Sequence, residues 1–180
     1  SAPFAFSALQ NNDKVCFILF SDEVELFIPP KKWKSHVLRI IRELLEFTPK
    51  SSETNVTEAL KFLTNVMKKK AIVFLLSDFI VDDYDATLRI VGNKHDVTGI
   101  RVYDEKEQAM PNIGMVQMLD AETGLLELVN TRSKKVRNAY GQFHQEKVDY
   151  FSNAFAKSGS GAIHCRVDES YVKKLLGYFK

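Results

Sequence analysis

Four oxygen-bearing side chains stand where the sequence predicts that strands end or that a helix begins. Asp78 follows an apolar run, Asp22 and Asp104 end or follow two other runs, and Thr54 precedes the start of a helix. A hydroxyl and a carboxylate, with water in the remaining positions, form the ligand set of a hard divalent cation such as magnesium. We therefore take Thr54 and Asp78 as candidate metal ligands, with Ser77 beside them as a lesser candidate.

Both main candidates have a structural alternative. The hydroxyl of Thr54 would equally satisfy free N–H groups at the start of a helix, as an N-cap does. The carboxylate of Asp78 would equally cap or turn the chain. The residues alone leave both alternatives open.

Other kinds of catalytic or cofactor site lack their motifs. The sequence has no glycine-rich phosphate loop, no closely spaced pair of His or Cys ligands and no nucleophile elbow. The four histidines, His36, His95, His144 and His164, lie far apart, which favours structural or surface roles. A metal-assisted hydrolase or phosphotransferase at the same edge remains an alternative to a non-enzymatic binding module, and it would need a nucleophile or general base near Asp78.

The stretch that must position Asp78 spans residues 71–78 and reads AIVFLLSD. Six consecutive apolar residues predict a strand buried on both faces, inside a parallel sheet that helices cover. Ligands of open α/β sheets bind beyond the carboxyl ends of the strands. We therefore expect Asp78 to lie at the functional edge of the sheet.

The order of the remaining elements predicts an α/β fold. The run at 15–20 resembles another interior strand, and the alternating stretch from Val24 to Ile28 predicts an antiparallel edge strand that ends at Pro29-Pro30. We then expect helices at 32–47 and from about Asn55, the strand at 71–76, a helix capped by Asp82-Asp83, and a strand at 97–103. This alternation is typical of a doubly wound, mostly parallel sheet.

The pattern changes in the second half of the chain. Short apolar runs at 115–119 and 125–129 predict a β-hairpin insertion, within residues 114–130, joined by the turn at 120–124. A long helix at 133–157, a strand at 162–167 and a final helix after Asp168 follow. We predict a single domain spanning residues 1–180.

Length, composition and charge exclude several classes of protein. A chain of 180 residues that is 45% hydrophobic and 27% charged is ordinary for one globular domain. A net charge of +2, with dispersed basic residues, argues against nucleic acid or an anionic membrane as a partner. No apolar run reaches the roughly 18 residues of a membrane span, and no leader peptide is evident. Cys16 and Cys165 lie in apolar runs, which predicts reduced thiols and a reducing compartment.

Several short motifs, kept in order along nearly the whole chain, resemble one bacterial family. They are DKV at 13–15, LFSDEVE at 19–25, FIPP at 27–30, TNVTEAL at 54–60, FLLSDF at 74–79, HDV at 95–97, DAETG at 120–124 and YVKKLL at 171–176. That family is the domain of unknown function numbered fifty-eight, which is allied to von Willebrand factor A domains.

The resemblance implies a Rossmann-like sheet with a metal-ion-dependent adhesion site. In such domains an Asp-x-Ser-x-Ser loop, a Thr and an Asp hold the metal, and Thr54 and Asp78 are similar in position to the last two. The first loop is absent, and Glu53 stands where the family usually has Gly. The resemblance also implies cytoplasmic action with a MoxR-type AAA ATPase as partner.

The missing loop suggests a fragment truncated at its amino end. Residues 1–12 would be the remnant of the first helix, and the strand before it, central in the family's sheet, would be absent. We expect magnesium binding to be weak or absent in this form. We also expect the strands at 15–20 and 71–76 to pair directly or to accept a strand from another copy, giving a homodimer. Another possibility is a scaffold whose binding surface lies on the hairpin around residues 120–124.

Overall fold

The computed structural model describes residues 13–51, 53–104, 108–119 and 126–178. The chain divides into two compact units, and each is described by itself. Unit 1 comprises Ser1–Ile72 and Asp83–Asp96, and unit 2 comprises Val73–Asp82 and Val97–Lys180. The single domain expected over 1–180 stays a prediction, and the helix remnant expected at residues 1–12 lies outside the described residues.

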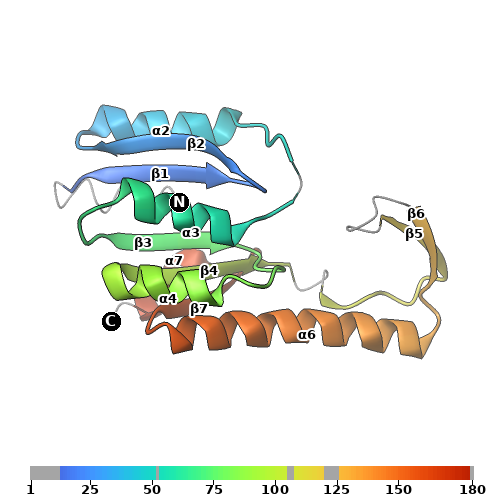
Figure 1. The fold of residues 1–180 in the computed structure, drawn as a ribbon. Helices are drawn as coiled ribbons and strands as arrows, with labels where there is room; N and C mark the ends of the chain where they lie inside the picture. The colour runs from blue at the N-terminus through green and yellow to red at the C-terminus, as the bar shows by residue number, and fades with distance from the viewer. Residues whose placement is uncertain (1–12, 52, 105–107, 120–125, 179–180) are drawn as a thin grey trace. The chain divides into compact units, whose positions relative to one another are not determined.

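Unit 1 contains an antiparallel strand pair, as the alternation of apolar and polar residues predicted. β1 (Val15–Phe20) pairs with β2 (Val24–Lys31), with Ile18 opposite Phe27 (Figure 1). The expected end of the second strand at Pro29-Pro30 is wrong, because β2 continues through both prolines to Lys31. Proline is compatible with an edge strand, whose outward positions need no N–H donor for the ladder.

Three helices complete the described part of unit 1. They are α2 (Lys34–Glu46), α3 (Val56–Val66) and α4 (Asp85–Lys94). α2 buries His36, Val37 and Ile40, whereas its N-cap residue Trp33 has φ 88° and is 75% exposed.

The helix that follows Asp82-Asp83 has a different start from the one predicted. The N-cap of α4 is Tyr84, which is fully buried, and its side chain makes no capping hydrogen bond. The carbonyl of Asp83 instead accepts a hydrogen bond of 3.0 Å from the Thr57 hydroxyl of α3. α3 and α4 therefore contact each other through buried residues and through this bond.

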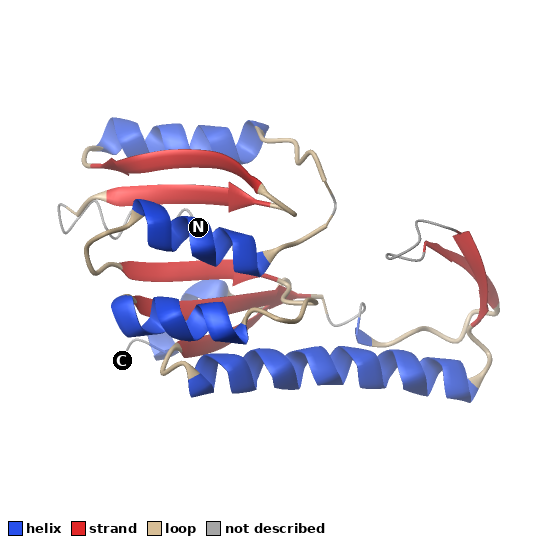
Figure 2. Ribbon diagram, viewed as in Figure 1, coloured by secondary structure: helices blue, strands red, loops and turns tan. Residues whose placement is uncertain are grey.

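Unit 2 is built on a three-stranded sheet with the order β3–β4–β7 (Figure 2). Its strands are β3 (Ile72–Ser77), β4 (Asp96–Tyr103) and β7 (Gly161–Arg166). β4 and β7 are parallel, with Arg101 opposite His164. The prediction of an α/β fold with a parallel sheet is thus confirmed.

Helices cover both faces of this sheet. A Cβ atom on Gly99 would meet Phe155 Cε1 at 2.5 Å and Phe151 Cε2 at 2.9 Å, so that face lies against α6 (Lys134–Lys157). Gly161 lies opposite Thr98, whose side chain points to the other face, and a Cβ there would collide with Tyr178 of α7 (Tyr171–Tyr178). Because neighbouring residues of a strand point to opposite faces, the two helices lie on opposite sides of the sheet.

The strand at 72–77 is less buried than its sequence predicted. Leu75 is the one buried residue of β3, and Ile72 is 69% exposed. The reason is its place at the end of the order β3–β4–β7, where it has one strand neighbour. The expected direct pairing between β1 and β3 stays a prediction, because β1 belongs to unit 1 and nearly all of β3 to unit 2.

The hairpin and the long helix of unit 2 match their predicted ranges closely. β5 (Met115–Leu119) and β6 (Leu126–Asn130) are antiparallel, and their connection at 120–125 lies outside the described residues. Ser133 caps α6 by accepting a hydrogen bond from the Val136 N–H at 3.4 Å. The carboxyl half of α6 packs against the sheet, and its amino end contacts the base of the hairpin (Figure 1). No helix within the described ranges is both long and apolar enough to cross a membrane.

Candidate functional site

Asp78 lies directly after β3 and is exposed to solvent. Its Oδ1 accepts a hydrogen bond from the Ile80 N–H and one from the Ser77 hydroxyl, both at 3.3 Å. The Ser77 hydroxyl also accepts a bond of 3.1 Å from the Phe79 N–H. Asp78 therefore turns the chain, as the structural alternative held, while Oδ2 accepts no hydrogen bond from any described residue.

Phe79 fixes this turn in the interior of unit 2. It has φ 56° and no solvent exposure. Its ring lies 4.5 Å from that of Phe151 and 5.5 Å from that of Phe155, both on α6. A non-glycine residue with a positive φ costs free energy, which the burial of this large ring offsets. The exposed Asp78 is therefore held in place by the buried Phe79 that follows it.

Arg101, two residues before the end of β4, interacts electrostatically with Asp78. It is only 3% exposed, its Nε has no hydrogen-bond partner within the described ranges, and its guanidinium carbon lies 4.6 Å from the centre of the Tyr103 ring. Burial lowers the pKa of Arg101, and its electrostatic interactions with Tyr103 and with the Asp78 carboxylate oppose that effect. A buried guanidinium normally has an anionic partner, and Asp78 supplies part of that charge here.

His164 lies beside Arg101 in the register of β4 and β7. Burial lowers the pKa of His164, and the positive charges of Arg101 and Lys174 lower it further. Its Nε2 is 3.4 Å from the Ser152 hydroxyl, but that hydroxyl donates to the Val148 carbonyl at 2.9 Å. The Ser–His contact therefore lacks the proton arrangement of a nucleophile and its base.

Thr54 lies in unit 1, half-buried and two residues before α3. The N-cap of α3 is Asn55, whose Oδ1 accepts a hydrogen bond of 3.0 Å from the Glu58 N–H. The capping alternative for Thr54 is therefore wrong, and the cap belongs to its neighbour. No hydrogen bond to the Thr54 hydroxyl is found within the described residues.

The end of β1 meets the start of α3 within unit 1. The Asn55 N–H donates to the Ser21 carbonyl at 2.7 Å, and the Ser21 hydroxyl donates to Asp22 Oδ1 at 2.9 Å. The hydrogen bond from Ser21 lowers the pKa of Asp22, with a smaller contribution from Ser51. These bonds connect Asp22, through Ser21, to the loop that contains Thr54. Asp104, in contrast, follows β4 and belongs to unit 2.

The pairing of Thr54 with Asp78 stays a prediction, because Thr54 belongs to unit 1 and Asp78 to unit 2. In the ranges that the structure describes, no group of three or more His, Cys, Asp or Glu side chains could hold a metal ion. The enzymatic alternative also stays a prediction. Neither hydrogen bond that the structure gives for the Asp78 carboxylate comes from a histidine.

Sequence reasoning missed Arg101 as part of this edge. Its signal was a single charged residue within the otherwise uncharged strand VTGIRVY at 97–103. A charge in a buried strand is rare unless it has a partner. That signal could have placed Arg101 beside the carboxylates at the ends of the strands.

Comparison with known proteins identifies one matching family and solved structures with a similar fold. The model of a family described as "Protein of unknown function DUF58" matches residues 1–149. A search of curated proteins found no match.

Two solved structures from Bacteroides resemble the chain in fold. The first is an aerotolerance-related membrane protein from Bacteroides fragilis NCTC 9343, carrying multiple mutations to serines. It has a TM-score of 0.53 and 16% identity, and the match covers 97% of this chain and 83% of that one. The second, the conserved hypothetical protein BatB from Bacteroides thetaiotaomicron, has a TM-score of 0.48 and 14% identity, over 97% and 82% of the two chains.

Proposed function

Since the chain belongs to the family described as protein of unknown function DUF58, we propose that it is a non-enzymatic protein-interaction module with a Rossmann-like, von Willebrand A-like fold. The module holds a partner protein through a divalent metal ion bound at the carboxyl edge of its strands. Fold likeness to the Bacteroides fragilis protein supports the architecture. The binding role rests on the oxygen chemistry at this edge.

The observation that carries the proposal is the state of Asp78. Its carboxylate is exposed at the end of β3, and Oδ1 is occupied by two weak hydrogen bonds while Oδ2 is open to a ligand. Magnesium prefers carboxylate and hydroxyl oxygens and keeps several waters. The Ser77 hydroxyl is a further oxygen beside Asp78, and the family resemblance adds the hydroxyl of Thr54 as a proposed ligand.

We expect the affinity for magnesium to be low. Two protein oxygens leave most of the six positions to water. The positive charge of Arg101, which interacts with Asp78, also opposes a second cation there. Partner carboxylates would complete the coordination, so metal and partner bind best together.

The cellular role follows from the family resemblance. We propose action in the cytoplasm with a MoxR-type AAA ATPase as the protein partner. The free thiols of Cys16 and Cys165 support a reducing compartment. Burial raises the pKa of Cys16 to about 11, so this thiol stays protonated and unreactive at neutral pH.

Magnesium titration by calorimetry tests the metal site. We expect weak binding by the chain, with a dissociation constant of about 1 mM. Asp78→Asn should abolish binding and Thr54→Ala should weaken it. Asp96→Asn, at the amino end of β4, is the matched control and should bind as the unaltered chain does.

Two results would contradict the proposal. One is undiminished magnesium binding by Asp78→Asn. The other is equal affinity in the chain and in a form to which the Asp-x-Ser-x-Ser loop has been added, because that loop should contribute further ligands.

A further inference from the structure

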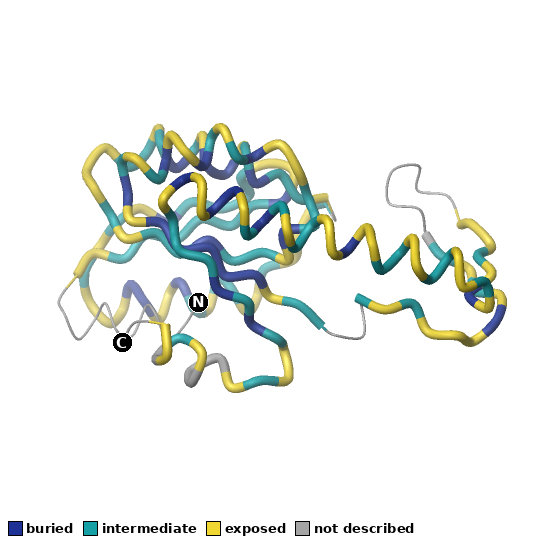
Figure 3. Tube along the Cα trace, turned by 90° about the horizontal axis from the view of Figure 1, so that it is seen from below, coloured by how far each residue is buried: buried dark blue, intermediate teal, exposed yellow. Residues whose placement is uncertain are grey.

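The hairpin of unit 2 carries apolar side chains on both of its faces. Met115, Leu126 and Leu128 share one face by the register of β5 and β6, and they are 56%, 66% and 63% exposed. Val116 and Met118 point to the other face. A two-stranded ribbon is marginally stable by itself, and exposed apolar patches of this kind mark contact sites. Figure 3 shows the exposed positions along this part of the tube.

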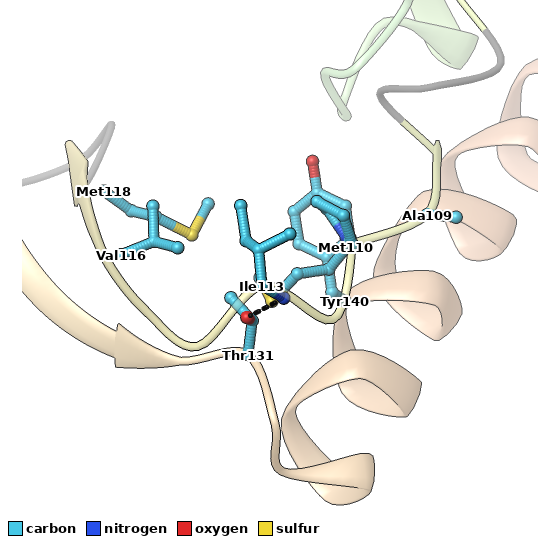
Figure 4. Close-up of a pocket in the computed structure, with 8 residues that line it drawn as sticks. Ala109, Met110, Ile113, Val116, Met118, Thr131 and Tyr140 are labelled. Atoms are coloured by element: carbon cyan, nitrogen blue, oxygen red, sulfur yellow. Dashed lines mark hydrogen bonds between the residues drawn. The ribbon is translucent and has the colours of Figure 1, made fainter.

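The second face closes a small pocket at the base of the hairpin. Its lining includes Met110, Ile113, Val116, Met118 and Tyr140, and its volume is about 140 Å³ (Figure 4). An apolar cavity of about 150 Å³ holds a benzene ring. The pocket therefore has room for one large apolar side chain, and Ile113 at its wall is 69% exposed.

Hydrogen bonds hold the base of the hairpin in place. The buried Thr131 hydroxyl donates to the Gly114 carbonyl at 2.7 Å and accepts from the Ile113 and Gly114 N–H groups at 3.0 and 2.9 Å. The Arg137 guanidinium of α6 donates to the Thr131 carbonyl at 2.6 Å. A pocket held in this way is preorganised, which lowers the entropic cost of binding.

Positive charge adjoins this surface. Arg132, Lys134 and Lys135 are exposed where β6 joins α6. Of the residues that the structure describes, no carboxylate forms an ion pair with any of the three. A partner with negative charge would therefore find unpaired cations next to the apolar ribbon.

We propose that this hairpin surface binds an acidic segment of a partner protein, with one large apolar side chain of that segment in the pocket and its carboxylates facing Arg132, Lys134 and Lys135. A pocket of this volume accepts a single side chain, whereas a bilayer presents a flat surface. A second copy of the chain would bring the same three positive charges to the contact. The surface shares no residue with the proposed metal site, because every residue that forms it lies between Ala109 and Tyr140.

Selection from a random-peptide phage library, with the 180-residue chain as target, tests the proposal. The selected peptides should combine a large apolar residue with neighbouring Asp or Glu residues. Fluorescence anisotropy then measures the affinity of the selected peptides for variants of the chain. The affinity should fall at least about tenfold, which is about 1.4 kcal/mol, in Ile113→Ser and in Lys134→Glu/Lys135→Glu. Binding should persist in EDTA, which would abolish binding through a metal.

Matched control variants alter equivalent residues elsewhere. Ile90→Ser replaces an apolar residue that is 62% exposed on α4, and Lys68→Glu/Lys69→Glu reverses another exposed basic pair. Both should bind the peptides as the unaltered chain does. All altered side chains are exposed, so circular dichroism should show unchanged folding.

Other outcomes would overturn the proposal. They include failure to select any peptide, and selected peptides whose binding is unchanged in Ile113→Ser and Lys134→Glu/Lys135→Glu. Binding to vesicles of phosphatidylglycerol and phosphatidylcholine in place of peptides, lost in the same variants, would assign the surface to a membrane. Self-association lost in those variants would assign it to a second copy.

Discussion

Thr54 and Asn55 are neighbours in sequence with different roles in the structure. Asn55 Oδ1 accepts a hydrogen bond from the Glu58 N–H at the start of α3, whereas the Thr54 hydroxyl does not cap the helix. Asn55 therefore stabilises the helix, whereas the adjacent Thr54 is available to a ligand. Mutation of each residue can distinguish the two roles.

We predict that Asn55→Ala lowers the free energy of unfolding by about 1 kcal/mol, because an N–H of α3 loses its cap. Thr54→Ala, the matched control, should change it by less than about 0.5 kcal/mol. Urea denaturation in EDTA measures both. A larger loss from Thr54→Ala than from Asn55→Ala would show that the capping role is assigned to the wrong residue.

His95 is a buried histidine whose imidazole makes no hydrogen bond to any residue that the structure describes. The residue is 3% exposed, and both ring nitrogens are unsatisfied. Burial lowers its pKa, and the charge of Lys94 lowers it further. Between the lowered pKa and the ordinary value of about 6.5, the unfolded chain binds more protons than the folded chain does. Stability should therefore fall as the pH falls below about 6.5.

We predict that His95→Leu reduces this loss of stability in acid. The substitution removes the titrating group and the unsatisfied nitrogens, so stability at pH 7.5 should stay equal or rise. Urea denaturation between pH 7.5 and 5 measures both effects. Part of the pH dependence should remain, because the pKa of His164 is also lowered. An unchanged slope in His95→Leu would contradict the assignment.

At the scale of elements, α6 packs on the sheet of unit 2 through a glycine. The rings of Phe151 and Phe155 occupy the space that a side chain at Gly99 would need. The approach of helix and strand is thus set by the absence of a Cβ atom. The sequence showed a glycine in a strand, and only the packed helix gives its reason.

We predict that Gly99→Ala destabilises unit 2 by about 1–3 kcal/mol, because the added methyl group overpacks two buried rings. Gly141→Ala is the matched control, since nothing lies within 4 Å of a Cβ atom there and Gly141 belongs to α6. That substitution should stabilise the helix by about 0.5–1 kcal/mol. Thermal unfolding followed by circular dichroism compares the two. Equal effects of the two substitutions would contradict the packing argument.

At the scale of the whole molecule, the described part of each sheet leaves the apolar strands β1 and β3 with one strand neighbour within their own sheet. Exposed strand edges are sites for pairing with another chain. We therefore keep the proposal that a strand from a second copy pairs with one of them and gives a homodimer. It is distinct from the hairpin surface, which we assign to an acidic segment.

We predict that sedimentation equilibrium shows a concentration-dependent dimer. Ile72→Lys places a charge at an exposed position of β3 and should weaken the dimer, because charge at an edge disfavours pairing. Ile90→Lys, on α4, is the control and should leave it intact. A monomer at every concentration, or a dimer unaffected by Ile72→Lys, would refute the pairing.

The sequence by itself determined the order of the elements, the hairpin and the carboxylate that ends β3. These features depend on local patterns, namely runs of apolar residues, turn residues and the spacing of helices. The resemblance to the DUF58 family, carried by ordered short motifs, is confirmed by the match over residues 1–149.

Only the tertiary structure decided which of these residues are buried and which partners they have. It buried Arg101 inside unit 2 and formed the pocket beside the hairpin. Each of these depends on segments that are distant in sequence. Burial and hydrogen bonding are set by what packs against a residue, and a local pattern carries no information about that neighbour.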